Sequence, residues 1–347
     1  MRYIGNKENL LDKIYHTMLE KDIYGNSFFD FFSGTTNVAR FFKKKNYQIF
    51  SSDLLYFSFV LQKAYIANNK ELTFEKLLQN ININSNYLFS TSLEKIVEYL
   101  NKIPNKQGFI FENYTPAGKR MYYTEENGLR IDTIRQQIEN WKNESLISEN
   151  EYFVLLACLI ETIPFYANVA GIYAAFHKKW DPRAVKKLVL RPIETIVNDK
   201  ENFVYNIDSV SLIDKIEADI FYLDPPYNQR QYAPNYHLME TIARYDNPEI
   251  KGVTGIRANY ESEKSKFCNA TTALQELKKI AENGKYKTLI LSYNNEGIMP
   301  EKEILSIFGK IGTVELVEFD YTRFKSNNSG ESSDKKYIKE QLYILRK

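Results

Sequence analysis

The sequence is poor in the residues that build structural metal sites and disulfide frameworks. Its 347 residues include only two cysteines, Cys158 and Cys268, and three histidines, His16, His177 and His237. The two cysteines stand far apart in the chain, and no CxxC spacing occurs. A zinc site and a disulfide framework are therefore not indicated, which suits a reducing cytosol. We expect no metal in the functional site, and we expect neither cysteine to be a nucleophile.

Two glycine-rich phosphate-binding motifs are missing as well. The chain contains neither a GxGxxG stretch nor a GxxxxGK[ST] loop. This absence weakens the hypothesis of a dinucleotide or a nucleoside triphosphate as ligand. The formal net charge of +2 is close to balance, so composition alone does not indicate a nucleic-acid partner either.

Long apolar runs are also absent. The longest, Phe153–Ile160, is too short to span a bilayer and predicts a buried helix. The chain begins with MRYIGNKENLL, which lacks the apolar region of a signal peptide. We therefore expect a soluble, cytoplasmic protein.

What the sequence does contain is a succession of short apolar strands. Apolar runs that end in polar or glycine residues recur at 27–34, 47–53, 202–209, 218–224 and 286–295. Helical periodicity follows the first run, where Val38, Phe41 and Phe42 share one face. Strands that alternate with helices predict an α/β fold with a doubly wound, mostly parallel, Rossmann-like sheet. The apolar stretches 313–324 and 335–347 flank the polar stretch 325–334 and predict an antiparallel C-terminal hairpin.

A long segment separates the second and third predicted strands. An α/β sheet needs only a short connection there, so residues 71–197 are predicted to form an inserted subdomain. The sheet domain then comprises residues 1–70 and 198–347.

The insertion is predicted to be largely helical. Ile131, Ile134, Ile138 and Trp141 form an apolar stripe, and Ser148 with Glu151 forms a capping box. In WDPRAVKK, Asp181 as cap and Pro182 as the first helical residue predict one more helix, which would be basic.

Acidic residues end several of the predicted strands. Asp30 ends the first and is followed by Phe32, Ser33 and Gly34, while Asp53, Asp208 and Asp224 end the second, third and fourth. Ligands of open α/β sheets bind beyond the carboxyl ends of the strands, and an acid about 20 residues after the first turn commonly binds a ribose. A strand that ends in aspartate is by itself most often a turn or a helix cap. The ordered set, with DPPY after the fourth strand, favours a site for a nucleoside that lacks a pyrophosphate.

The chain resembles the alpha-group (Dam-like) family of DNA adenine-N6 methyltransferases. The residues that carry the resemblance are YIGNKENLL, DFFSGTTNVARFF, SSDL, NID and LDPPYN, which cover roughly residues 1–67 and 202–347. The family keeps its target-recognition domain where this chain has its insertion. The resemblance implies a methyltransferase sheet that binds S-adenosyl-L-methionine. It also implies double-stranded DNA as substrate and a restriction-modification system with a separate cognate endonuclease.

The resemblance also implies roles for individual residues. The cofactor's amino-acid and methyl region would be lined by Tyr3, Lys7, Asp30 and the turn Phe32–Ser33–Gly34. Asp53 would bind the ribose hydroxyls, and Asp208 would bind the amino group of the cofactor's adenine. Asp224 and the rest of the DPPY loop would hold the target base near the methyl group.

The chemistry of DPPY explains why such a loop would be catalytic. The Asp224 carboxylate and the Pro225 carbonyl can accept both N–H bonds of an adenine amino group and so free its lone pair. Pro225 and Pro226 keep that carbonyl fixed. Tyr227 offers a flat face to a base that has been flipped out of the duplex. Direct in-line transfer would then follow.

Other functions stay open from the sequence. Related Asn-Pro-Pro-Tyr loops act on RNA bases or on protein glutamine amides, and a non-catalytic DNA-binding specificity subunit could keep the same fold. After DPPY, the side chains of Gln229, Arg230 and Gln231 could contact bases or phosphates. Tyr232 and Tyr236 could fill the space that a flipped base leaves.

Overall fold

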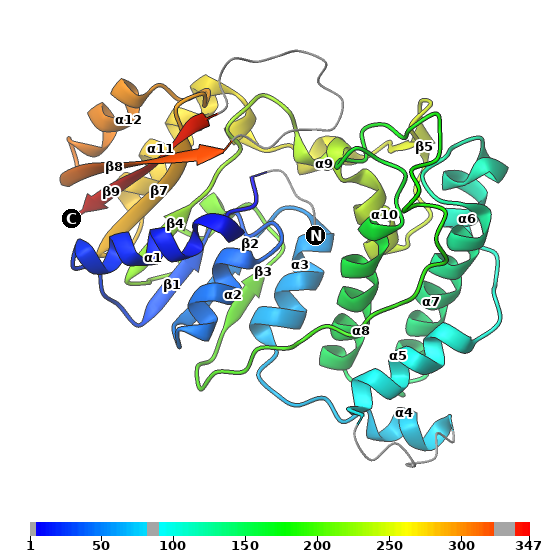
Figure 1. Ribbon diagram of the computed structural model, residues 1–347. Coiled ribbons are helices and arrows are strands. Elements are labelled where there is room, and N and C mark those ends of the chain that lie inside the picture. Colours follow the sequence, from blue (N-terminus) through cyan, green and yellow to red (C-terminus); the bar gives the residue numbers. More distant parts are fainter. Residues whose placement is uncertain (1–4, 82–89, 323–336) are drawn as a thin grey trace.

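The computed structural model describes residues 5–81, 90–322 and 337–347 and contains one seven-stranded sheet (Figure 1). The strand order is β3-β2-β1-β4-β7-β9-β8, in which β9 is antiparallel to both of its neighbours and the first five strands are parallel. The predicted Rossmann-like sheet with an antiparallel C-terminal pair is therefore confirmed. The strands are β1 Ser27–Asp30, β2 Gln48–Ser52, β3 Phe203–Tyr205, β4 Ile220–Leu223, β7 Thr288–Asn294, β8 Thr313–Thr322 and β9 Tyr337–Arg346.

Two apolar clusters cover the two faces of this sheet. Side chains alternate along β4, so that Ile220 and Tyr222 join one cluster while Phe221 and Leu223 join the other. Against the sheet, the first cluster includes residues of α1 Leu11–Glu20, α2 Asn37–Lys44 and α3 Tyr56–Gln62. The second takes them from α11 Ala270–Asn283 and α12 Glu301–Phe308. Burial on both faces is what the near-continuous apolar runs of these strands require.

The winding direction of the sheet reverses between β1 and β4. The chain proceeds outward from β1 through β2 to β3, then returns to β4 on the other side of β1 and continues to β7. Asp30 ends β1 level with Ser51 of β2 and Tyr222 of β4. The acids that follow these strands therefore converge on one edge, at the position where open α/β sheets bind ligands.

Helices form the long connection between β2 and β3, as predicted. Beyond α3, the α-helices of this connection in the described residues are α4 Glu75–Asn80, α5 Ser92–Lys102, α6 Phe109–Tyr114, α7 Glu125–Asn143 and α8 Glu149–Thr162. The predicted apolar stripe of α7 is buried, and the capping box between Ser148 and Glu151 is present at the start of α8. None of the helices in the described ranges combines the length and the apolar character needed to cross a membrane.

The segment after β4 lies with the inserted helices rather than with the sheet (Figure 1). It contains α9 Tyr232–Asn235, α10 His237–Arg244 and the short antiparallel pair β5 Ile250–Lys251 and β6 Ile256–Arg257. Helix α10 packs against both α3 and α8. The buried Arg135 of α7 donates to the carbonyls of Ile242 (3.1 Å) and Ala243 (3.3 Å) near the end of α10. One apolar cluster therefore runs from the sheet through α10 into the insertion.

The prediction of a basic helix within 181–187 is wrong, because residues 182–185 form only a turn. The side chain of Asn127 in α7 donates to the carbonyls of Ala184 (3.1 Å) and Lys186 (2.9 Å). Its amide oxygen accepts the N–H of Leu188 at 2.9 Å. These three bonds use backbone groups that a continuing helix would need for itself.

The lysine run 43–45 at the end of α2 contains a fully buried member. The Nζ of Lys43 donates to the carbonyls of Tyr65 (2.9 Å), Ile66 (2.8 Å) and Asn68 (2.7 Å). These carbonyls lie in and just after the π-helical turn Lys63–Ala67 that extends α3. Burial lowers the pKa of Lys43, whereas the three acceptors favour its charged form. Lys43 thus caps a helix that is distant in sequence.

We expect Lys43→Met to destabilise the protein, because the substitution leaves three buried carbonyls without their donor. The free energy of unfolding in urea should fall by about 2–3 kcal/mol. The control is Lys44→Met, which changes the exposed neighbour in the same helix and should leave the unfolding midpoint nearly unchanged. Equal midpoints for the two variants would show that Lys43 does not serve as a cap.

Candidate active site

A cavity opens where the strand order reverses. It encloses about 860 Å³ of empty space, part of it open to solvent. Its lining includes residues that directly follow β1, β2, β3 and β4. Seven of the predicted site residues line it: Phe32, Asp53, Asp208, Asp224, Pro225, Pro226 and Tyr227.

The DPPY corner at the end of β4 is anchored by a buried lysine. The Nζ of Lys7 lies 3.3 Å from Oδ1 of Asp224 and 3.2 Å from Oε2 of Glu340 in β9. Burial alone would lower the pKa of Lys7, but the charges of Asp224 and Glu340 raise it above its ordinary value. Lys7 therefore stays protonated and joins the N-terminal segment, the DPPY corner and the last strand.

The carboxyl group of Asp224 is held in an environment that opposes its charge. Burial raises its pKa to about 6, Lys7 acts in the opposite direction, and Glu340 adds to the rise. Tyr227 is half-buried, and its carbonyl accepts the N–H of Ile298 at 3.1 Å. Gly5 approaches the same corner with φ +78°, and a Cβ there would lie 3.5 Å from Oη of Tyr232. The corner is thus fixed from three parts of the chain.

Asp30 at the end of β1 is a buried carboxylate without a partner. It is 1% exposed, and neither of its oxygens, nor the hydroxyl of Ser33, has a hydrogen-bond partner in the described residues. Burial raises the pKa of Asp30 to about 7, and the charges of Asp224 and Asp53 contribute. An unpaired buried acid is costly, so a ligand with N–H donors or a positive charge would be stabilised there.

Asp53 after β2 is held by the backbone around it. Its carboxylate accepts the N–H of Gly34 at 2.8 Å and the N–H of Leu55 at 2.9 Å. Gly34 has φ +49°, a left-handed conformation that favours glycine. Burial raises the pKa of Asp53 to about 6, although these two hydrogen bonds act in the opposite direction. The Gly34 turn and Asp53 are therefore held together by a hydrogen bond at the carboxyl ends of β1 and β2.

The remaining predicted residues have simple placements. Asp208 lines the cavity and accepts the N–H of Val210 at 3.1 Å, which caps the short helix Ser209–Leu212. Tyr3 lies outside the described residues, as does the polar stretch 325–334 of the predicted hairpin. Burial raises the pKa of Cys158 to about 12 and that of Cys268 to about 11, which makes both thiols poor nucleophiles.

The segment after α10 supplies a further wall of the cavity that sequence reasoning missed. Glu263, Ser265, Lys266 and Phe267 line the cavity. The Phe267 ring meets Phe32 edge to face, with the ring centroids 4.9 Å apart. These residues follow no motif in the sequence, and only the fold brings them to the strand ends.

Two side chains predicted to contact DNA are engaged within the protein instead. Gln231 donates to the carbonyl of Ser265 at 3.0 Å and accepts its N–H at 2.7 Å, so Gln231 fastens the wall described above. Tyr236 is 1% exposed and stacks with Tyr232, which leaves it no access to the space of a flipped base. The side chains of Gln229 and Arg230 are exposed, so both could make the predicted contacts with bases or phosphates.

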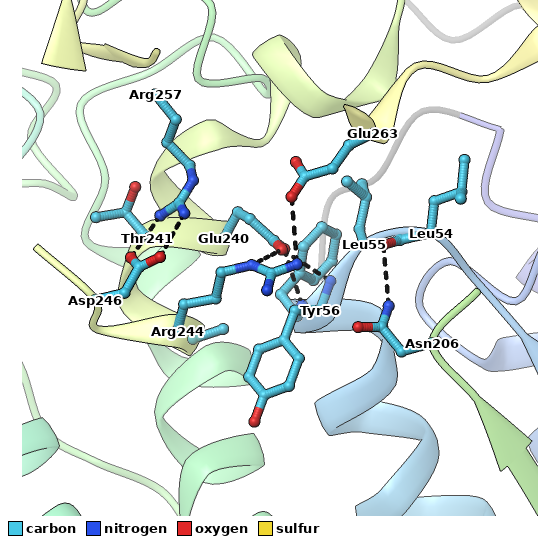
Figure 2. A network of polar contacts seen from close by, with 12 residues as sticks. Leu54, Leu55, Tyr56, Asn206, Glu240, Thr241, Arg244, Asp246, Arg257 and Glu263 are labelled. Atoms are coloured by element: carbon cyan, nitrogen blue, oxygen red, sulfur yellow. Dashed lines mark hydrogen bonds and ion pairs between the residues drawn. The ribbon is translucent and has the colours of Figure 1, made fainter. Parts of the chain in front are cut away.

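A polar network connects this wall to the turn that carries Asp53 (Figure 2). Glu240 of α10 accepts the N–H groups of Tyr56 (2.9 Å) and Phe57 (3.0 Å), the first residues of α3. The side chain of Asn206 donates to the carbonyls of Asp53 (3.0 Å) and Leu54 (2.9 Å). A buried acid from a distant helix therefore caps α3, whose own N-cap residue is a leucine.

Comparison with known proteins agrees with this geometry. The family model of the D12 class N6 adenine-specific DNA methyltransferases matches residues 3–307. The chain is 42% identical to the type II methyltransferase M.FokI of Planomicrobium okeanokoites and 40% identical to the modification methylase StsI of Streptococcus sanguinis. All of this chain is matched in both cases, but only 53% and 52% of those relatives, so the chain spans about half their length.

A third relative is matched over nearly its full length. The type II methyltransferase M.NlaIII of Neisseria lactamica is 35% identical, with 100% of this chain and 99% of the relative covered. The seven predicted site residues that line the cavity belong to the motifs that carried the resemblance to the Dam-like enzymes. The chain belongs to the D12 class of N6 adenine-specific DNA methyltransferases.

Proposed function

We propose that the protein transfers a methyl group from S-adenosyl-L-methionine to the exocyclic amino group of adenine in duplex DNA. The observation that carries this proposal is the DPPY corner, fixed by Lys7 on the cavity that also contains Asp53. The names of the relatives, type II methyltransferases and modification methylases, support a role in restriction-modification. A cognate endonuclease would act as a separate protein, and a DNA substrate suits the expected cytoplasmic location.

The residues present fit this cofactor. The unpartnered carboxylate of Asp30, with the Ser33 hydroxyl, suits the ammonium group of the cofactor's amino-acid tail. Asp53 keeps lone pairs for the ribose hydroxyls, because each of its oxygens accepts one backbone N–H and a carboxylate oxygen can accept more than one donor. Asp208 lies on the cavity for the adenine amino group. When bound, the cofactor supplies an electrophilic methyl group on a sulfonium sulfur.

The DPPY corner would prepare the target nitrogen. The Asp224 carboxylate and the Pro225 carbonyl accept the two N–H bonds of the flipped adenine, which draws its lone pair out of conjugation with the ring. Lys7 directs the carboxylate, and the fixed φ angles of Pro225 and Pro226 limit reorganisation. Tyr227 stacks on the base and offsets part of the cost of unstacking, a few kcal/mol.

We infer that residues 71–197 read the DNA sequence, while residues 1–70 and 198–347 carry catalysis. An irregular stretch of the insertion bears the exposed lysines Lys178, Lys179, Lys186 and Lys187. Such a surface suits contact with phosphates. Arg183 in this stretch instead pairs with Asp181 at 2.6 Å.

Methyl incorporation from labelled cofactor tests the proposal directly. The label should enter duplex DNA. After digestion of the DNA to nucleosides, the label should be recovered as N6-methyl-2′-deoxyadenosine. Label in RNA or in protein glutamine would favour the other acceptor classes of this loop. Binding of duplex DNA without any methyl transfer would favour a specificity subunit.

Asp224→Asn should reduce the rate of methyl transfer at least 100-fold, because the variant loses the charged acceptor for the amino group. S-adenosylhomocysteine should still bind within about threefold of the wild-type affinity. The rate is measured in single-turnover experiments and the affinity by calorimetry. The matched control is Asp214→Asn, an exposed aspartate, which should behave as wild type. Wild-type turnover by Asp224→Asn would remove this residue from the mechanism.

Cofactor binding should release protons near neutral pH. The pKa of Asp30 is raised to about 7 by burial, then by Asp224 and Asp53, so much of Asp30 is protonated in the free protein at pH 7. An ammonium group beside it favours the ionised form. Binding of S-adenosylhomocysteine should therefore release about half a proton at pH 7 and little at pH 9, and affinity should weaken as the pH falls below 7.

Calorimetry in buffers of different ionisation enthalpy measures this release. Asp30→Asn should bind S-adenosylhomocysteine more weakly and lose most of the proton release at pH 7. Equal proton release by the variant and the wild type would assign the effect to another group.

A further inference from the structure

Glu263 is a carboxylate on the cavity with one oxygen unpaired. Its Oε1 accepts a hydrogen bond from Arg244 at 3.2 Å, and its Oε2 has no partner among the described residues. The side chain is 13% exposed and lines the cavity together with Asp53, Leu54 and Leu55. Figure 2 shows one oxygen of Glu263 joined to Arg244 by a dashed line, with its second oxygen pointing away from Arg244. The ion pair with Arg244 accounts for the position of Oε1 but gives Oε2 no partner.

Arg244 holds Glu263 in a fixed position. The Nε of Arg244 donates to Glu240 at 2.6 Å, and its guanidinium carbon lies 5.0 Å from the centre of the Tyr56 ring. Glu240 is 1% exposed and caps the start of α3 directly after the Asp53 turn. The two carboxylates that line the cavity here, Asp53 and Glu263, are therefore tied to one rigid network.

Burial raises the pKa of Glu263 to about 7, Glu240 adds to the rise, and Arg244 opposes it. A buried carboxylate oxygen that lacks a donor is destabilising unless a ligand supplies one. Asp53 already accepts one backbone N–H on each oxygen. The cis-diol of a ribose brings two O–H donors to this position, so a second acceptor would complete its hydrogen bonding.

We infer that Glu263 is a second acceptor for the ribose hydroxyls of the cofactor, alongside Asp53. This inference rests on the proposed function, because it concerns the nucleoside that the cavity binds. It assigns part of the cofactor site to the segment after α10. That segment is bound on its other side to the insertion, where Tyr114 donates to the carbonyl of Gly255 at 2.7 Å.

Glu276 in α11 provides a matched control. It lines the same cavity, is 14% exposed, pairs one oxygen with Lys266 at 3.0 Å and leaves Oε2 without a partner in the described part of the chain. Its helix packs against the short helix that follows Asp208. Glu276 should therefore have no contact with the ribose hydroxyls.

The experiment measures binding of S-adenosylhomocysteine and its 2′-deoxy and 3′-deoxy analogues by calorimetry. In Glu263→Gln, Arg244 needs an acceptor, so the amide oxygen faces Arg244 and the NH₂ group faces the cavity. We expect the wild type to bind at least one deoxy analogue about 10-fold or more weakly than the parent compound. Glu263→Gln should bind the parent about 10-fold more weakly and lose most of that deoxy penalty.

Glu276→Gln should keep the full deoxy penalty whatever its affinity for the parent. Equal loss of affinity for all three ligands in Glu263→Gln, or an unchanged deoxy penalty, would overturn the inference while leaving the proposed function intact. A wild-type protein that binds none of the three ligands would overturn both. Thermal unfolding of the free variants confirms that each is folded before it is titrated.

Discussion

The ion pairs of the buried Lys7 ammonium group with Asp224 and Glu340 are the interaction on which the cavity edge of the sheet depends. Without it, two carboxylates would face each other in a dry environment, and at least one would take up a proton. Lys7 connects the N-terminal segment to Asp224 at the end of β4 and to Glu340 in β9. The DPPY corner is therefore assembled only when both Lys7 and strand β9 are in place.

Negative charge is concentrated around the cavity. Five carboxylates and one lysine line it: Asp53, Asp208, Asp224, Glu263, Glu276 and Lys266. Such a lining favours a cationic ligand over a neutral one of the same shape. In the proposed reaction the sulfonium charge disappears on transfer, so the electrostatic attraction for the product is weaker than that for the substrate. The acids that would attract the cofactor would then also favour release of the product.

The features that could be predicted from the sequence are those that depend on residues close together in the chain. Asp30, Asp53, Asp208 and Asp224 each end an apolar run, and the sheet rule brings their backbone positions to one edge. The buried stripe of α7 follows from a period of 3.6 residues in the same way. Contacts between distant segments leave no such pattern. The pairing of Lys7 with Glu340 spans 333 positions, and the roles of Glu240 and Glu263 depend on where α10 packs. The helix predicted within 181–187 is absent for the same reason. The distant Asn127 binds the backbone of this stretch, although the local sequence carries a capping signal.

The apolar cluster that runs unbroken from the sheet through α10 into the inserted helices limits how residues 71–197 can be exchanged between relatives. A chimera that exchanges only 71–197 with a relative would set foreign side chains against the native α3 and α10. A graft that also carries residues 232–268 would keep the interface of α7 and α8 with α10 intact. Recombination between members of this class should therefore tolerate exchange of residues 71–197 and 232–268 together better than exchange of either segment alone.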